Sequence, residues 1–348
     1  MTRQTVTAFV AAVVFVVLAV LLVVIPVPYV TWGPGGTRDV LGEEGGEPII
    51  TVDGVPTYPT TGRLDMTVVS TTSAKSRLSL PQALLAYWLP HRDALPRQSV
   101  YPAGKSVEQV ESEDAELMET AQDDAVVAAL RADDLPVEEL PAVYSVTVGG
   151  PSHRLLLPGD LVVSVDGVAT PTNADVAAEI RKAKPGDTLT FVVLRQKKET
   201  TVEVVAAVSP TQAGQANVGI SIGTGYSYTP SIAFELGRKI GGPSAGLIFA
   251  LAIYDKLTPG PLLAGQHLAG TGTISPEGQV GAIGGIQEKI AGAEDAGATT
   301  FLVPAANCGD LAGVRTSMRL VKVATLSDAV TAVQALGTPG QADTLARC

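Results

Sequence analysis

An unbroken apolar run near the start of the chain constrains its fold more than any other feature. Ala8–Ile25 is a stretch of 18 consecutive apolar residues, and three more apolar residues follow by position 30, past two prolines. A helix rises about 1.5 Å per residue, so this stretch is about long enough to cross a hydrocarbon core of roughly 30 Å. A buried core helix is the alternative, but a soluble helix is not so uniformly Val, Leu and Ala, which favours a bilayer contact over residues 8–30.

A cleavable signal peptide is the main alternative to a permanent anchor. Its apolar region usually has about 7 to 15 residues, and no clear A-x-A cleavage site follows this longer run. Arg3 precedes the run, and the next basic residue is Arg38. Basic residues that flank a membrane span tend to stay on its cytoplasmic side. We therefore expect a single span at the cell membrane, with the N-terminus in the cytoplasm and the chain after Tyr29 outside it. The sequence leaves open whether the segment is ever cleaved.

Composition and charge exclude several classes of protein. The chain has 348 residues, of which 46% are apolar and 17% charged, so wholesale disorder is excluded. A net charge of -11 without clustered Lys and Arg argues against a nucleic-acid partner. The three histidines are far apart in sequence, so we expect no metal site. Cys308 and Cys348 would pair in an oxidising compartment, or would be two unrelated free thiols.

The segment after the anchor has mixed helical and strand patterns. Residues 31–48 are rich in Gly, Pro and acidic residues, which is typical of a stalk or loops. Short β-branched runs predict strands, and a proline-initiated run and an acidic amphipathic run predict helices. The strands are expected at Ile49–Val55 and Leu64–Thr71, and the helices at Pro81–Leu89 and Glu113–Leu130.

From about Leu135 to Val208 the pattern changes to short strands around one helix. The stretch L-L-L-P-G-D-L-V-V-S-V-D-G-V, residues 155–168, resembles the strand and turn of a bacterial PDZ domain. A helix at 175–183 and a hairpin at 188–207 follow. The resemblance implies capture of an extended peptide by β-addition, whereas the alternative is a small structural β domain. No carboxylate-binding loop is recognisable upstream of Val143, so no peptide-binding residues are assigned.

A candidate nucleophile lies in the stretch I-G-G-P-S-A-G-L-I-F-A-L-A-I-Y-D-K, residues 240–256. Pro243 suits the first turn of a helix, and the residues that follow are apolar on all sides, which predicts a buried helix. Ser244 would then lie at the helix N-terminus, where unpaired N–H groups favour a developing oxyanion. The alternative is a serine that merely caps a core helix.

A candidate base lies in the stretch G-A-I-G-G-I-Q-E-K-I-A-G-A-E-D-A-G-A-T-T-F-L-V-P, residues 281–304. At about 100° per residue, Lys289 falls at the shoulder of the apolar stripe, while Glu288 and Asp295 fall near the opposite pole. Partial burial would lower the pKa of this lysine toward that of a general base. The alternative is a surface lysine whose ammonium group reaches solvent.

These stretches together resemble the proteolytic domain of Lon proteases. The matching blocks are G-P-S-A-G, T-G-T-I-S-P-E-G-Q-V-G-A-I-G-G-I-Q-E-K and A-G-A-T-T-F-L-V-P, within about residues 215–335. The resemblance implies that Ser244 is the nucleophile, Lys289 the base, and Thr271 a residue that orients them. It also implies that Gly242, Pro243 and Ala245 form the loop that carries the nucleophile and binds the oxyanion. Many ATP-dependent Lon proteins carry Asp where this chain has Gly241, so regulation by that carboxylate is in doubt.

A nucleotide-binding motif is not recognisable. The nearest match, S-V-Y-P-A-G-K-S at 99–106, lacks the first glycine and the strand-to-helix context of a P-loop. We therefore expect no cofactor and no nucleotide. The anchor, PDZ-like segment and Lon-like segment resemble the ATP-independent, membrane-anchored Lon-like proteases of bacteria. This family implies protein or peptide substrates and a homo-oligomeric ring.

Two other functions compete with this interpretation. G-P-S-A-G also fits the nucleophile elbow of α/β-hydrolases, in which the triad could only be Ser244, Asp255 and His267. The short spacings leave little room for the strands and helices of that fold. A catalytically silent PDZ scaffold at the membrane is the second alternative, although the presence of both Ser244 and Lys289 argues against it.

The expected fold class is α+β, with a small twisted sheet packed by helices in the protease domain. The expected segments are residues 1–30 for the cytoplasmic end and anchor, 31–134 for an N-terminal ectodomain segment, 135–208 for the PDZ domain, 209–337 for the proteolytic domain and 338–348 for a C-terminal tail.

Overall fold

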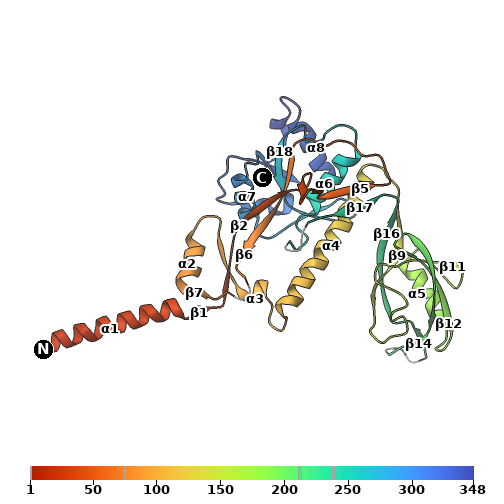
Figure 1. Ribbon diagram of the computed structural model, residues 1–348, viewed down its shortest axis with the longest axis horizontal. Helices are drawn as coiled ribbons and strands as arrows, with labels where there is room; N and C mark the ends of the chain where they lie inside the picture. Colours follow the sequence, from red (N-terminus) through yellow and green to blue (C-terminus); the bar gives the residue numbers. More distant parts are fainter. Residues whose placement is uncertain (1, 74–75, 211, 213, 237–239) are drawn as a thin grey trace. The chain divides into compact units, whose positions relative to one another are not determined.

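The computed structural model describes residues 2–73, 76–210, 212, 214–236 and 240–348. The chain forms two compact units (Figure 1). Unit 1 combines Met1–Asp134 with Pro230–Cys348, and unit 2 is Leu135–Thr229. Met1 of the expected anchor and residues 237–239 of the expected proteolytic domain lie outside the described residues.

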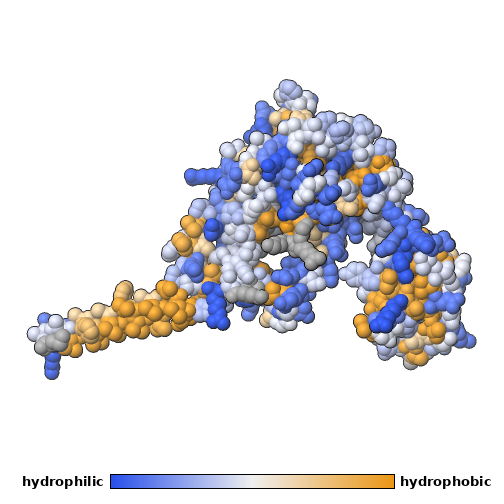
Figure 2. Space-filling view, in the orientation of Figure 1, coloured by the Kyte–Doolittle hydropathy of each residue, from blue (hydrophilic) through white to orange (hydrophobic). Residues whose placement is uncertain are grey.

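The apolar run forms helix α1, Arg3–Val24, and none of its residues is buried (Figures 1 and 2). By length and composition this helix could cross a membrane. The helix ends before Pro26 and Pro28, because proline has no N–H to donate and disfavours helix at the residue before it. The expected bilayer contact over residues 8–30 therefore extends too far along the chain. Val30 is 1% exposed and lies in a strand of the folded core.

A six-stranded mixed sheet forms the centre of unit 1. Its order is β22-β21-β18-β6-β2-β8; the first four strands run parallel, and β2 is antiparallel to both neighbours. The strands are β22 Arg319–Val323, β21 Thr300–Pro304, β18 His267–Gly270, β6 Arg63–Thr71, β2 Tyr29–Asp39 and β8 Asp93–Pro96.

Strand β2 corrects the expectation that residues 31–48 form a stalk. It pairs with β6 from Trp32 opposite Thr71 to Asp39 opposite Asp65. Its Gly- and Pro-rich sequence lacks alternating apolar residues, so it gave no strand signal. The N-terminal segment is consequently not separate from the proteolytic segment, because β2 and β6 lie in the same sheet as β18, β21 and β22.

Helices α6, Gly246–Leu257, and α7, Ile286–Asp295, cover opposite faces of this sheet. Successive strand side chains point to opposite faces. Ala269 packs with the buried residues of α7, whereas the next residue, Gly270, lies against Ile248 of α6. Helices α4, Val107–Ala132, and α8, Leu326–Leu336, pack beside α6. Helix α6 is buried along nearly its whole length, as expected.

Shorter elements complete unit 1. They are β1 Pro26–Val27, β3 Glu43–Glu44, β4 Glu47–Pro48, β5 Ile50–Asp53, β7 Leu78–Ser79, α2 Leu80–Trp88, α3 Arg97–Val100, β17 Ser231–Phe234, β19 Thr273–Ile274, β20 Val280–Gly281, η1 Ala305–Leu311 and η2 Ala342–Thr344.

Unit 2 is a sheet packed against one helix, with a core of aliphatic side chains around Phe191. Its sheet order is β13-β12-β10-β9-β16, with β11 paired to β10. Strand β16 extends the unit beyond the expected boundary at Val208. The elements are β9 Val137–Val146, β10 Leu161–Val165, β11 Val168–Ala169, α5 Asn173–Lys182, β12 Thr188–Arg195, β13 Lys198–Val205, β14 Ala207–Val208, β15 Ala216–Asn217 and β16 Ile220–Tyr228.

The C-terminal tail is fixed to the central sheet. Cys308 and Cys348 form a disulfide, with their Cα atoms 5.0 Å apart. The N–H of Lys322 in β22 also donates a hydrogen bond to the carbonyl of Ala346 at 3.0 Å. Of the two alternatives for these cysteines, the structure has the paired one.

Candidate active site

Ser244 lies in a turn just before helix α6. The helix begins at Gly246 with Ala245 as its N-cap, so Ser244 precedes the helix rather than lying in its first turn. The carbonyl of Ser244 accepts hydrogen bonds from the Thr271 hydroxyl and the Gly272 N–H, each at 2.9 Å. These bonds direct the carbonyl toward the end of β18 instead of into the helix, which explains why the expected helix start is two residues too early.

Thr271 and Gly272 follow β18 directly, so the serine lies at the carboxyl end of a parallel strand. Gly272 has a φ of +151°, and a Cβ there would lie 2.9 Å from Cγ1 of Val280 and 3.3 Å from Cβ of Leu247. Contacts this short require glycine. The T-G pair can therefore approach the serine loop because its second residue has no side chain.

Lys289 reaches the serine from helix α7. Its Nζ lies 2.6 Å from Oγ of Ser244 and 3.0 Å from Oγ1 of Thr271. The lysine is only 3% exposed, and this burial lowers its pKa to about 8. Loss of hydration disfavours the ammonium form, so about a tenth of the lysine is neutral amine at pH 7. The structure thus brings together the three residues expected for catalysis.

The loop that carries Ser244 is hydrogen-bonded to helix α4. The N–H of Gly242 donates to the carbonyl of Asp114 at 2.9 Å. A Cβ on Gly241 would lie 2.8 Å from Cβ of Asp114, so this position has no room for a side chain. Sequence patterns do not identify Asp114, because none links a residue in the acidic half of α4 to a loop more than a hundred residues later.

The expected loop residues differ in what their backbones can offer a substrate. Pro243 has no N–H, and Gly242 donates its own to Asp114. The N–H groups of Ser244 and Ala245 therefore become the candidates for contact with a substrate oxygen. They adjoin the N-terminus of a buried helix, where the dipole favours negative charge.

Glu288 departs from the expectation that it faces solvent. It is 3% exposed, and its pKa is raised by burial and by hydrogen bonding and charge from Asp93 on β8. Strand β2 of the central sheet contacts α7, and Asp93 of β8 lies within hydrogen-bonding reach of Glu288. A wheel for a helix with one apolar stripe cannot show that other strands of the same sheet also cover its polar side.

The residues of the competing hydrolase triad have other partners. His267 Nε2 lies 2.8 Å from Oδ2 of Asp65, which also accepts from Thr37 Oγ1 at 2.9 Å. Asp255 Oδ1 instead accepts the backbone N–H of Leu262 at 2.7 Å. Among the described contacts, His267 therefore pairs with Asp65, whereas Asp255 accepts a hydrogen bond from the backbone at Leu262.

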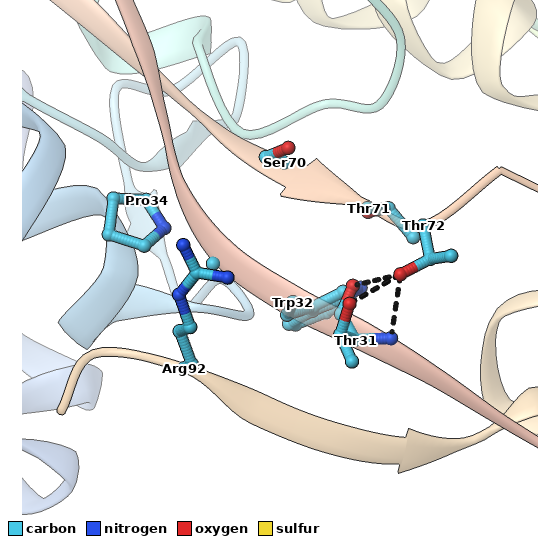
Figure 3. Close-up of a pocket in the computed structure, with 8 residues that line it drawn as sticks. Thr31, Trp32, Pro34, Ser70, Thr71, Thr72 and Arg92 are labelled. Atoms are coloured by element: carbon cyan, nitrogen blue, oxygen red, sulfur yellow. Dashed lines mark hydrogen bonds between the residues drawn. The ribbon is translucent and has the colours of Figure 1, made fainter. Parts of the chain in front are cut away.

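A small polar cavity lies beside the N-terminal end of α7 (Figure 3). It has a volume of about 150 Å³ and is formed by residues 31–34 of β2, 70–72 at the end of β6, and Arg92. A Cβ on Gly284 would lie 3.2 Å from the ring of Trp32, so the cavity wall adjoins the loop that leads into α7. Sequence patterns gave no sign of this cavity.

Comparison with known proteins identifies two domains. Residues 238–335 match the family described as the Lon protease (S16) C-terminal proteolytic domain, and residues 110–205 match the PDZ domain family. The PDZ match begins inside α4, which the structure assigns to unit 1. The fold and the site define a chain of mixed α/β architecture with an N-terminal apolar helix. This chain carries a Lon-type proteolytic domain and a PDZ domain.

Bacterial Lon proteases are similar to part of the chain. A Lon protease of Roseiflexus castenholzii is 35% identical over 173 residues, covering 47% of this chain and 21% of the relative. Lon protease 2 of Herpetosiphon aurantiacus is 44% identical over 78 residues, covering 22% of this chain and 9% of the relative. The chain therefore spans about a fifth or less of the length of these relatives.

Among solved structures, the PDZ domain of an SdrC-like protein from Listeria monocytogenes is similar to part of the chain. It has 24% sequence identity and a TM-score of 0.22, and it covers 24% of this chain and 85% of the other.

Proposed function

We propose that this protein is a membrane-anchored serine endopeptidase that works without ATP, with Ser244 as nucleophile and Lys289 as general base. The observation that carries the proposal is the 2.6 Å separation of Lys289 Nζ and Ser244 Oγ in a buried site. A lysine can act as a base only when neutral, and burial lowers its pKa to about 8.

The proposed reaction uses the lysine twice. The neutral Lys289 amine takes the Ser244 hydroxyl proton as Oγ attacks the peptide carbonyl, giving a tetrahedral intermediate whose oxyanion contacts the N–H groups of Ser244 and Ala245. The Lys289 ammonium then donates that proton to the leaving amine, and the acyl-enzyme forms. Neutral Lys289 next takes a proton from a water molecule as its oxygen attacks the acyl ester, and the Lys289 ammonium then returns this proton to Oγ, which releases the carboxylic acid and restores Ser244.

Thr271 is proposed to position the other two residues. Its hydroxyl donates to the Ser244 carbonyl, so its oxygen lone pairs are available to the Lys289 ammonium. This pair of bonds would hold Nζ in line with Oγ through each proton transfer. Preorganised donors and acceptors of this kind need no rearrangement during the reaction.

The PDZ unit is proposed to select polypeptides for cleavage. Strand β16 lies at one end of the sheet order, and helix α5 contacts it. An extended peptide end could add to this strand and lie along the helix, in the manner of β-addition. The edge of β16 beside α5 is therefore the proposed peptide-binding region, for which the sequence alone assigned no residues.

We place the enzyme at the cell membrane, with the N-terminus of α1 in the cytoplasm and both units outside. Helix α1 is apolar enough to cross a bilayer, and Arg3 lies at its start. The Cys308–Cys348 disulfide supports an oxidising compartment, because cytosolic thiols are kept reduced. A homo-oligomeric ring is part of the proposal on the resemblance to Lon-type domains.

Comparison of extracytoplasmic proteomes tests this function. Cells that carry the wild type should show peptide fragments that are missing from cells with Ser244→Ala, while Ser275→Ala should behave as wild type. Identical fragment patterns in all three would favour a catalytically silent PDZ scaffold. External protease should digest both units in intact spheroplasts, and complete protection would overturn the proposed orientation.

A further inference from the structure

Helix α2, Leu80–Trp88, buries small residues and exposes large apolar ones, the reverse of a soluble surface helix. Its buried residues are the small Ala83 and Ala86. Its large residues face outward, and Leu85, Tyr87 and Trp88 are 56%, 68% and 73% exposed. A helix on a water-exposed surface normally turns its large apolar side chains toward the core and its polar ones outward.

The exposed side chains form one continuous face. At about 100° per residue, Leu84, Trp88 and Leu85 fall at roughly 100°, 140° and 200° from Ala83. Leu89 follows immediately and is 40% exposed. Leucine and aromatic side chains grouped in this way mark a surface that contacts another apolar phase. Figure 2 shows apolar surface on this part of unit 1 as well as on α1.

The start of α2 is hydrogen-bonded to the chain that leaves α1. Strand β1 directly follows the α1 C-cap and pairs with β7, with Pro26 opposite Ser79 and Val27 opposite Leu78. Helix α2 begins at the next residue, Leu80, and contacts α1. Paired strands lie about 5 Å apart. The polar interface of a bilayer is of similar depth, roughly 5 to 8 Å on each side.

We propose that α2 lies in the lipid–water interface of the bilayer that α1 crosses, with Leu84, Leu85 and Trp88 in contact with acyl chains. The inference rests on the proposed anchor. Tyr29, 40% exposed, follows β1, so three aromatic residues occur at this level of the chain: Tyr29, Tyr87 and Trp88. Tyr and Trp are enriched at membrane interfaces because their rings are apolar and their N–H or O–H groups are polar.

Basic residues at both ends of this segment favour an anionic lipid surface. Arg77 precedes β7 and Arg92 follows α2, and both are exposed. Arginines near such a surface are attracted by its negative potential. A short amphipathic helix binds by its apolar face together with charges of this kind. With α2 seated there, unit 1 would be held by two elements rather than by α1 alone.

Tryptophan fluorescence can test this contact directly. The chain has two tryptophans, so Trp32→Phe leaves Trp88 as the single reporter. Within the described residues the indole N–H of Trp32 has no hydrogen-bond partner, so phenylalanine there removes no bond. The full-length variant is placed in nanodiscs of phosphatidylcholine and phosphatidylglycerol, with or without bromine near the top of the acyl chains.

Contact with the interface predicts that shallow bromines remove more than about half of the Trp88 fluorescence, because the ring lies at the headgroup level. Aqueous iodide should have little effect. Leu85→Glu in the same background should reduce the bromine quenching at least about twofold, because a charge resists burial in lipid. The matched control Leu117→Glu changes an exposed leucine on α4 and should leave the quenching unchanged.

Three results would overturn the inference. Strong iodide quenching without bromine quenching would place Trp88 in water. Shielding of Trp88 from both agents would mean that a second copy covers the face. Failure of the protein to enter nanodiscs would remove the anchor, and the inference with it. Labelling of Ser244 by a serine-reactive probe is measured on the same sample and reports on the proposed protease separately.

Discussion

The Nζ of Lys289 in α7 lies 2.6 Å from the Oγ of Ser244, which directly precedes α6, although these two helices cover opposite faces of the central sheet. They meet because Ser244 precedes α6 and its carbonyl is held at the end of β18. The carboxyl ends of parallel strands are where open sheets commonly place their sites. At this distance the Lys289 amine can take the Ser244 hydroxyl proton directly.

The first prediction concerns pH. Burial lowers the pKa of Lys289 to about 8, so the base is charged and inactive below that pH and neutral above it. The rate of Ser244 labelling by a fluorophosphonate probe should rise about tenfold per pH unit below pH 8 and level off above it. Lys289→Gln should remove this inflection. A flat wild-type profile between pH 6 and 8 would contradict the assignment of Lys289 as base.

The second prediction concerns Thr271. Thr271→Val removes its bonds to Lys289 Nζ and to the Ser244 carbonyl, and should slow labelling about tenfold to thirtyfold, on the order of 1 to 2 kcal/mol. Thr271→Ser keeps a hydroxyl and should retain most of the rate. Equal loss in both variants would mean that the threonine methyl, rather than its hydroxyl, matters.

The third prediction concerns the attachment of the nucleophile loop to α4. Gly241→Asp would push a side chain into Asp114 and break the bond from the Gly242 N–H. Labelling of Ser244 should fall at least about tenfold, because a shift of the nucleophile of 1 Å can cost a hundredfold in rate. The matched control Gly309→Asp has open space around it and should label normally. Normal labelling of Gly241→Asp would show that α4 does not position the loop.

The fourth prediction concerns the disulfide. Reduction of Cys308–Cys348 frees the tail and opens a long loop, which the chain-entropy account values at about 4 kcal/mol. The melting temperature of unit 1 should fall by roughly 5 °C or more in calorimetry. Cys308→Ser, Cys348→Ser and the double variant should show the same loss, since each breaks one bond. Additive losses would indicate that the cysteines stabilise the fold independently.

The sequence predicted the elements whose own residues carry a periodic signal. The apolar α1, the buried α6 and the hairpin of unit 2 all follow from local patterns. Ser244, Thr271 and Lys289 were recognised because their motifs come in a fixed order along the chain. A contact between residues 45 positions apart cannot be calculated from periodicity, so the resemblance to a family was needed to pair the serine with the lysine.

What the sequence could not show depends on tertiary packing. Strand β2 has a sequence typical of loops, yet it is a strand because β6 and β8 pair with it on both sides. Glu288 looked exposed because the residues that bury it come from β2 and β8 of the central sheet, far away in sequence. The role of Asp114 is carried by its backbone carbonyl, which no side-chain pattern reports.

The most direct test of the central claim is active-site labelling of the full-length protein in detergent. A fluorophosphonate should attach to Ser244 of the wild type, and peptide mass spectrometry should place the adduct on that residue. Ser244→Ala should show no adduct, and Lys289→Gln should label at least about a hundredfold more slowly, because a positioned base contributes that much. Ser275→Ala should label as wild type. An unlabelled wild type, or equal labelling of Ser244→Ala, would contradict the proposed serine protease.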